Sequence, residues 1–261
     1  MAEAWDDAAS YEAYVGRWSR RLAPRFVAWA SLPKGARVLD VGCGTGALSE
    51  AVLRGGARSV LGVDRSPSYV AQATAMVGGR DARFEVGDAM KLAFPDASFD
   101  AAVSGLVLNF LPDPAAGARE MARAVEPGGV VALYVWDYAG EMQMMRRFWD
   151  AARALDAKAE ELDEGVRFPI CKPDALAKLL EAAGLRDVRT APVDQPTVFR
   201  DFDDYWTPFT GGQAPAPGYA RSLPPERLAA LRERLRATLP TEPDGSIHLV
   251  ARAWAARGTR A

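Results

Sequence analysis

The sequence predicts an α/β protein with a doubly wound, mostly parallel sheet. Short apolar runs alternate along the chain with segments of helical periodicity, and acidic or hydroxyl side chains stand where several runs end. The runs show little polar alternation, as strands buried on both faces require, so parallel pairing with right-handed crossovers is expected. Strands are predicted near residues 36–41, 59–63, 82–86, 99–104 and 129–136, and helices near 46–55, 67–77 and 114–126.

A glycine-rich turn follows the first predicted strand. Gly42, Gly44 and Gly46 stand at alternate positions directly after the run 38–41, and a helical segment begins behind them. Such a turn lets a ligand lie against bare backbone while helix N–H groups point at it. The spacing differs from the G-x-G-x-x-G of dinucleotide folds and from the G-x-x-x-x-G-K-[ST] of P-loops.

Two acidic residues accompany this turn. Asp64 ends the second predicted strand, 24 residues after Asp40, and an acid at about this distance suits a bidentate contact with ribose hydroxyls. Asp40 would repel a pyrophosphate but suits a ligand that carries an ammonium and a sulfonium group. The alternative is a tight strand-to-helix connection that binds no ligand, but the turn and both acids together favour a nucleoside-containing cofactor.

Further motifs follow in a fixed order. After residues 41–46 and Asp64 in segment 62–66 come the segments 87–89, 92–100 and 127–129. In this order the chain resembles the class I S-adenosylmethionine-dependent methyltransferases, especially the small-molecule group that includes ubiquinone and menaquinone biosynthesis methyltransferases. The resemblance is close over residues 36–136 and loose over 140–225. It implies a Rossmann-like, seven-stranded sheet in which an antiparallel last strand inserts beside its predecessor.

The resemblance implies S-adenosylmethionine as cofactor and S-adenosylhomocysteine as product. Asp64 would bind the ribose hydroxyls, Asp88 would accept from the adenine amine beside the Ala89 N–H, and Asp40 would complement the ammonium. The other residues expected at the cofactor belong to the turns that carry these groups: Gly42, Cys43, Gly44, Thr45, Gly46, Arg65, Ser66 and Gly87.

Two further contacts with the cofactor are expected on the same basis. Ser104 and Leu106, after the fourth strand, would flank it through backbone atoms. Tyr14 or Arg17, on a predicted N-terminal helix spanning residues 5–31, would bind its carboxylate, Arg17 through a bidentate fork. The arginines of this helix are otherwise interpreted as a solvated face: Arg17, Arg20, Arg21 and Arg25.

Acceptor choice is expected to lie outside the cofactor core. The Met-rich helical segment 142–149 and an irregular aromatic segment, 201–218, are predicted to meet over the methyl group; ordinary core is the alternative. On this interpretation, truncating Trp206 should impair acceptor handling more than folding. The expected acceptor contacts are Asn109, Trp136, Tyr138, Met142, Met145, Tyr205, Trp206 and Phe209. No catalytic residue is assigned, because no general base stands out.

The whole chain is expected to form one methyltransferase domain, 1–261. It would comprise an N-terminal helical cover, 1–35, the cofactor core, 36–136, a lid region with the sixth strand, 137–225, and a last helix and strand, 226–261. Within the final two segments we expect helices at 174–183 and 225–238 and strands near 186–193 and 246–254.

Composition excludes several other functions. A net charge of −2 argues against a nucleic-acid partner, and two cysteines with one histidine provide neither a disulfide framework nor a metal site. No apolar run approaches about 18 residues and no signal peptide is evident, so a soluble, cytoplasmic protein without membrane insertion is expected.

We therefore expect an enzyme that methylates a small, apolar or aromatic acceptor by in-line displacement. Two alternatives remain: a catalytically silent protein that binds the same cofactor or a partner, and a nucleotide-sugar or NAD enzyme on a similar sheet.

Overall fold

The computed structural model describes residues 12–211 and 214–261, which group into two compact units. We call the first the sheet unit; it comprises Ser19–Val135, Lys172–Val193 and Trp254–Ala261. The second, the aromatic unit, comprises Trp136–Cys171, Asp194–Ala253 and the described residues before Ser19. Three strands and one helix continue from one unit into the other, and each unit is described below by itself.

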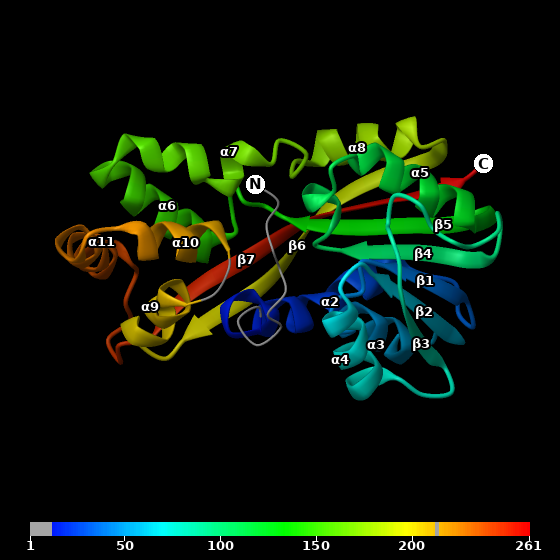
Figure 1. Cartoon of the computed structure of the whole chain (residues 1–261), viewed down its shortest axis with the longest axis horizontal. Coiled ribbons are helices and arrows are strands. Elements are labelled where there is room, and N and C mark those ends of the chain that lie inside the picture. Colours follow the sequence, from blue (N-terminus) through cyan, green and yellow to red (C-terminus); the bar gives the residue numbers. More distant parts are fainter. Residues whose placement is uncertain (1–11, 212–213) are drawn as a thin grey trace. The chain divides into compact units, whose positions relative to one another are not determined.

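A seven-stranded sheet organises the chain, in the order β3-β2-β1-β4-β5-β7-β6. Strands β1 to β5 pair in parallel, and in this register Asp40 lies beside Gly62 on one side and Val103 on the other. The last strand, β7, runs antiparallel between β5 and β6, as predicted (Figure 1). The strands are β1 Arg37–Val41, β2 Ser59–Asp64, β3 Ala82–Val86, β4 Phe99–Gly105, β5 Val125–Trp136, β6 Leu185–Phe199 and β7 Ile247–Arg260.

Helices connect the strands and begin at recognisable caps. Ser66 accepts a hydrogen bond from the Tyr69 N–H ahead of Pro67, and Asp113 caps the Ala116 N–H in the same way, so both helices start where the sequence favours it. The helices are α2 Arg17–Ala30, α3 Ala47–Arg54, α4 Pro67–Val77, α5 Pro114–Ala124, α6 Gln143–Leu155, α7 Glu164–Arg167, α8 Pro173–Ala182, α9 Phe202–Thr210, α10 Pro215–Ser222 and α11 Pro225–Thr238. Short turns occupy Glu12–Gly16, Leu108–Phe110 and Ala157–Leu162.

The direction of the chain reverses between β1 and β4. From β1 the chain winds outward through α3 and α4 to β3, and then returns to start β4 on the other side of β1. Right-handed crossovers therefore put α3 and α4 on one face of the sheet and α5 on the other. This reversal is the switch point at which open α/β sheets bind their ligands, outside the carboxyl ends of the strands.

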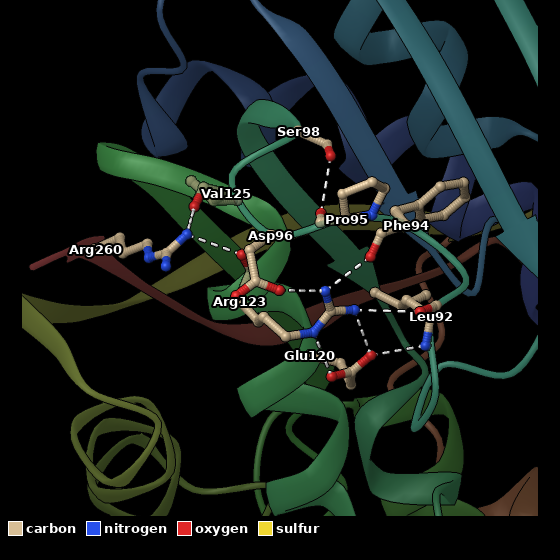
Figure 2. A network of polar contacts seen from close by, with 9 residues as sticks. All are labelled: Leu92, Phe94, Pro95, Asp96, Ser98, Glu120, Arg123, Val125 and Arg260. Carbon is tan, nitrogen blue, oxygen red and sulfur yellow. Dashed lines mark hydrogen bonds and ion pairs between the residues drawn. The ribbon is translucent and has the colours of Figure 1, made fainter.

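A polar network closes the opposite edge of the sheet unit (Figure 2). The Arg123 guanidinium bonds to the carboxylates of Glu120 and Asp96 and to the carbonyls of Leu92 and Phe94, so all five of its N–H donors are used. Nearby, Arg260 at the end of β7 donates to the Arg123 and Val125 carbonyls. The network fastens α5 and β7 to the loop before β4 and leaves no Arg123 donor for a ligand.

The predicted elements of the core are confirmed, and three expectations change. Strand β5 begins at residue 125 and β6 continues to 199, beyond the predicted boundaries. Segment 201–218, predicted to be irregular, instead forms α9 and the first half of α10. The N-terminal helix begins at Arg17 after a π-helical turn, and the earlier part of its predicted span lies outside the described residues. Among the described residues, no helix has the length and apolarity needed to cross a membrane.

Candidate cofactor site

The carboxyl ends of the central strands gather the predicted cofactor residues. Asp40 stands near the end of β1, Asp64 ends β2, and Ser104 lies one residue before the end of β4. The parallel pairing of these strands brings all three to the same edge of the sheet unit, at the switch point.

The glycine turn adopts a backbone that other residues avoid. Gly42, Gly44 and Gly46 have φ values of 75°, 51° and 86°. A Cβ at Gly42 would lie 2.6 Å from Val107 Cγ1, so the turn after β1 packs directly against the segment after β4. A Cβ at Gly44 would meet no atom within 4 Å, which leaves open space where the predicted ligand would approach the backbone.

Asp64 orders this turn and retains capacity for a ligand. Its Oδ2 accepts the Gly44 N–H at 3.0 Å and its Oδ1 accepts the Ser66 N–H at 2.9 Å. A carboxylate has about four lone-pair sites, so about two are left for a pair of ribose hydroxyls. Burial raises the pKa of Asp64, and the two backbone N–H groups oppose that rise. Arg65, the next residue, is exposed.

Asp40 is a buried carboxylate with one unused oxygen. Its Oδ2 accepts the Ser49 hydroxyl at 2.6 Å, whereas Oδ1 has no hydrogen-bond partner among the described residues. Burial, assisted by the Asp64 carboxylate, raises the pKa of Asp40 to about 7. A cation at Oδ1 would relieve both penalties, which fits the predicted contact with an ammonium. The same burial raises the pKa of the Cys43 thiol, so Cys43 is a small packed side chain and not a thiolate.

The segment after β3 carries the predicted adenine contacts. Asp88 is exposed, and its Oδ1 accepts the Met90 N–H at 2.8 Å, while Ala89 is buried. A Cβ at Gly87 would lie 2.7 Å from Val63 Cγ1, so this turn passes close to β2. The assignment of the adenine to these residues stays a prediction.

The residues at the end of β4 use part of their polar capacity within the sheet unit. The Ser104 hydroxyl donates to the Val41 carbonyl at 2.7 Å, and the Leu106 N–H donates to the Tyr134 carbonyl at 2.8 Å. The Leu106 N–H is therefore already used within the sheet unit, and contact of Leu106 with a cofactor stays a prediction. Leu106 also has a φ of 65°, a conformation that costs a residue with a Cβ about 1–3 kcal/mol.

The N-terminal helix contributes an arginine that sequence reasoning did not select. Arg20 donates to the Thr45 hydroxyl at 3.0 Å and so reaches the glycine turn. Arg17 instead pairs with Asp204 at 3.1 Å within the aromatic unit, and Tyr14 is buried there. The carboxylate contacts of Tyr14 and Arg17 remain predictions. Arg20 escaped notice because no local pattern announces a partner 25 residues away.

The predicted acceptor contacts divide between the units. All except Asn109 belong to the aromatic unit, where they are buried: Trp136, Tyr138, Met142, Met145, Tyr205, Trp206 and Phe209. Tyr205, Trp206 and Phe209 contact one another or neighbouring rings. The ring centroids of Phe209 and Phe148 are 4.5 Å apart, and the Tyr205 hydroxyl donates to the Met144 carbonyl. For these three residues core packing explains the burial, and contact with an acceptor stays a prediction for the whole set.

Asn109 lies in the sheet unit, on the short turn Leu108–Phe110 beyond β4. Its side chain is buried, and neither amide atom has a hydrogen-bond partner within the described part of the chain. The strands that flank the switch point, β1 and β4, thus each lead to an unpartnered buried polar group, Asp40 Oδ1 and the Asn109 amide. Residues 12–211 and 214–261 contain no cluster of three or more His, Cys, Asp or Glu suited to a metal ion.

Comparison with known proteins agrees with this geometry. Residues 39–133 match the family model described as a methyltransferase domain. A 2-methyl-6-phytyl-1,4-hydroquinone methyltransferase of Synechocystis sp. is 35% identical over 179 residues, 67% of this chain and 55% of that protein. A demethylmenaquinone methyltransferase of Roseiflexus sp. is 36% identical over 207 residues, 67% of this chain and 86% of the relative.

A solved structure shares the fold. A phosphoethanolamine N-methyltransferase of Haemonchus contortus, in complex with S-adenosyl-L-methionine, aligns with a TM-score of 0.58 at 17% identity, over 97% of this chain and 56% of that one. The present chain spans about half the length of the Synechocystis relative, but most of the Roseiflexus one. Identity and coverage of the latter establish the relationship: the chain belongs to the S-adenosylmethionine-dependent methyltransferase family.

Proposed function

We propose that this protein transfers a methyl group from S-adenosylmethionine to a small, apolar or aromatic acceptor. The observation that supports this most directly is the β1–β4 switch point. There, a turn of three left-handed glycines stands beside two acids. Asp64 has unused lone pairs, and Asp40 has a buried oxygen with no partner in the described part of the chain. These groups suit ribose hydroxyls and an ammonium, and a pyrophosphate would meet two carboxylates.

The relatives support the acceptor class. One is named for a hydroquinone that carries a phytyl group and another for demethylmenaquinone, a quinone. A third, of Amycolatopsis mediterranei, is named for 27-O-demethylrifamycin SV. These names favour a neutral acceptor with apolar or ring surface over a nucleic acid or a charged metabolite.

The residues of the site serve chiefly to position the reactants. When bound, the cofactor supplies an electrophilic methyl group, which passes to an electron pair of the acceptor while the sulfur keeps the bonding pair and S-adenosylhomocysteine results. Asp64 would fix the ribose, and Asp40 would hold the ammonium. The glycine turn would let the backbone approach the cofactor, so that the methyl group is presented in one orientation. Arg20, bonded to Thr45, would hold the turn from the side of α2.

Turnover tests the proposal. Purified protein is incubated with S-adenosylmethionine and one acceptor at a time: 2,6-dimethyl-1,4-hydroquinone, menadiol or a simple phenol. Both S-adenosylhomocysteine and the methylated product are measured by mass spectrometry. We expect product with at least one ring acceptor, and much less with Asp64→Ala at a cofactor concentration below the wild-type KM. Tight cofactor binding without turnover of any acceptor would favour the catalytically silent alternative.

A further inference from the structure

Asn109 is held in a constrained place at the carboxyl edge of the sheet unit. The chain leaves β4 through Leu106, whose φ of 65° is strained and whose N–H is fixed to the Tyr134 carbonyl. Val107 then packs against Gly42, where a Cβ would lie within 2.6 Å of it. The turn Leu108–Phe110 follows at once. The contact of Leu106 with β5 and that of Val107 with the turn after β1 therefore fix the backbone that leads into Asn109.

The side-chain amide of Asn109 is buried, and the described residues offer it no hydrogen bond. The residue is 7% exposed, and neither Oδ1 nor Nδ2 has a hydrogen-bond partner among the described residues. Burying an unpaired amide costs about 1–3 kcal/mol, and most buried polar side chains in folded proteins avoid that cost. Leu108, its neighbour, is an ordinary apolar core residue. An apolar side chain at this position would not carry that cost, so folding does not explain an amide here.

The chemistry of the amide limits what it can bind. Asn offers one acceptor oxygen and two N–H donors, which together match a group that both donates and accepts. A carboxylate would use only the donors and an ammonium only the oxygen, leaving the other half unpaired. Asp40 and Asp64, at the ends of the neighbouring strands, also disfavour an anion at this edge. The cofactor's ribose and ammonium are already matched by Asp64 and Asp40.

We propose that the Asn109 amide binds a neutral hydroxyl group of the acceptor. Oδ1 accepts the hydroxyl proton and Nδ2 donates to a hydroxyl oxygen, so Asn109 determines specificity for hydroxylated acceptors such as hydroquinones. A site that pairs with a hydroxyl discriminates strongly against the analogue without one, because its own polar atoms then stay buried and unpaired. This inference rests on the proposed methyl transfer and refines its acceptor class.

The chain offers a direct probe, since Asn109 is its only asparagine. Protein labelled with [¹⁵N]asparagine gives one side-chain NH₂ pair in a heteronuclear NMR spectrum. The protein is saturated first with S-adenosylhomocysteine and then titrated, under reducing conditions, with 2,6-dimethyl-1,4-hydroquinone or with its dimethyl ether. We expect the NH₂ pair to shift on addition of the hydroquinone and to stay in place with the ether, which has no O–H.

Several results would overturn the inference. The first is that the NH₂ signals reach their final position with S-adenosylhomocysteine alone. The second is that they shift as much with the ether as with the hydroquinone. The third is that the hydroquinone does not shift them at all. Failure of S-adenosylhomocysteine to bind at all would instead contradict the proposed function. The two proposals can therefore fail separately.

Substitution gives a second, independent test. Asn109→Leu removes the amide at similar volume, and Asn109→Gln keeps the amide but displaces it. For methylation of the hydroquinone we expect Asn109→Leu to lower kcat/KM at least tenfold and Asn109→Gln to lower it less. The dissociation constant of S-adenosylhomocysteine should change less than twofold.

The Tm of Asn109→Leu should equal or exceed that of the wild type, because an unpaired buried amide is lost. A lowered Tm together with unchanged kcat/KM would make Asn109 a structural residue.

Discussion

The two units bury polar and aromatic side chains in different ways. At the carboxyl edge of the sheet unit, Asp40 Oδ1 and the Asn109 amide are buried without partners among the described residues, and Asp64 has unused lone pairs. In the aromatic unit, Tyr205 donates its hydroxyl to a backbone carbonyl and Phe209 is enclosed by other rings. Burial alone thus does not distinguish a binding site from a core. Unpartnered buried polar atoms occur in both units, since Thr197 Oγ1 of the aromatic unit also has no partner among the described residues. What distinguishes the sheet unit is their place: Asp40 and Asn109 lie at the ends of the two strands that flank the switch point, beside the glycine turn.

The largest expected effect contrasts two rings of α9. Phe209 is fully buried among Tyr14, Phe148, Tyr205 and Trp206, so Phe209→Ala should lower the free energy of unfolding by about 3–5 kcal/mol. Trp206 is 7% exposed, and Trp206→Ala should cost less stability while raising KM or lowering kcat for the acceptor. Urea denaturation and steady-state kinetics measure both. If Trp206→Ala lost as much free energy of unfolding as Phe209→Ala, or kept full activity, Trp206 would be a core residue without a role at the acceptor.

The next effect concerns the ribose contact. Removing the Asp64 carboxylate deletes two charge-assisted hydrogen bonds to a ligand, each worth about 1.5–3 kcal/mol, so Asp64→Ala should weaken S-adenosylhomocysteine binding at least tenfold. Asp100 is the matched control, because it lies at the start of β4 and pairs with Arg37. Asp100→Ala should reduce stability without changing affinity. If calorimetry gave both variants the same dissociation constant, Asp64 would not be the ribose ligand.

A smaller effect separates steric from conformational demands in the glycine turn. Gly44→Ala should incur only the backbone cost of a left-handed residue, about 1–2 kcal/mol, because its Cβ would enter open space. Gly42→Ala should cost more, since its Cβ would also collide with Val107. Adding Val107→Ala to Gly42→Ala should recover part of the difference in Tm, because it removes both Cγ atoms but leaves the Cβ at 2.9 Å. A double variant no more stable than Gly42→Ala would show that Val107 is not the obstacle.

The smallest effect is a pH dependence from Asp40. Its pKa is raised to about 7, so the ligand-free protein should lose stability as pH rises from about 4, the ordinary carboxyl value, to about 7. Ionised Asp40 favours a cation, so affinity for S-adenosylmethionine should instead increase over this interval, with proton release near pH 7. Calorimetry in buffers of different ionisation enthalpy measures that release. Asp40→Asn should abolish this proton release. If the variant released as many protons as the wild type, the proton would come from another group.

Local signals were sufficient to predict much of the fold. Ser66 and Pro67 mark the start of α4, and the predicted spans of α4 and α11 agree with the structure. The glycine turn and the acids at strand ends likewise locate the candidate cofactor edge. Each of these signals lies within a few residues of the feature that it predicts.

Other structural features were not predicted from the sequence, either because two local signals compete or because the residues in contact are far apart in the chain. The strand predicted near 186–193 continues to 199 in β6. Pro192 and Pro196 are both exposed on this strand, which is the last one of the sheet and tolerates proline. In α9, Phe202, Tyr205 and Phe209 already have helical spacing, but Pro208 and the nearby glycines obscured it. The unpartnered state of Asn109 depends on the tertiary surroundings, which no sequence pattern contains.

The most direct test of the account is calorimetric comparison of S-adenosylhomocysteine with NAD⁺ on the same preparation. The glycine spacing, the ribose acid Asp64 and the buried carboxylate Asp40 predict saturable binding of S-adenosylhomocysteine and none of NAD⁺, whose pyrophosphate would meet both carboxylates. Equal or tighter binding of NAD⁺ would contradict the assignment of this edge to a methyl-donor cofactor.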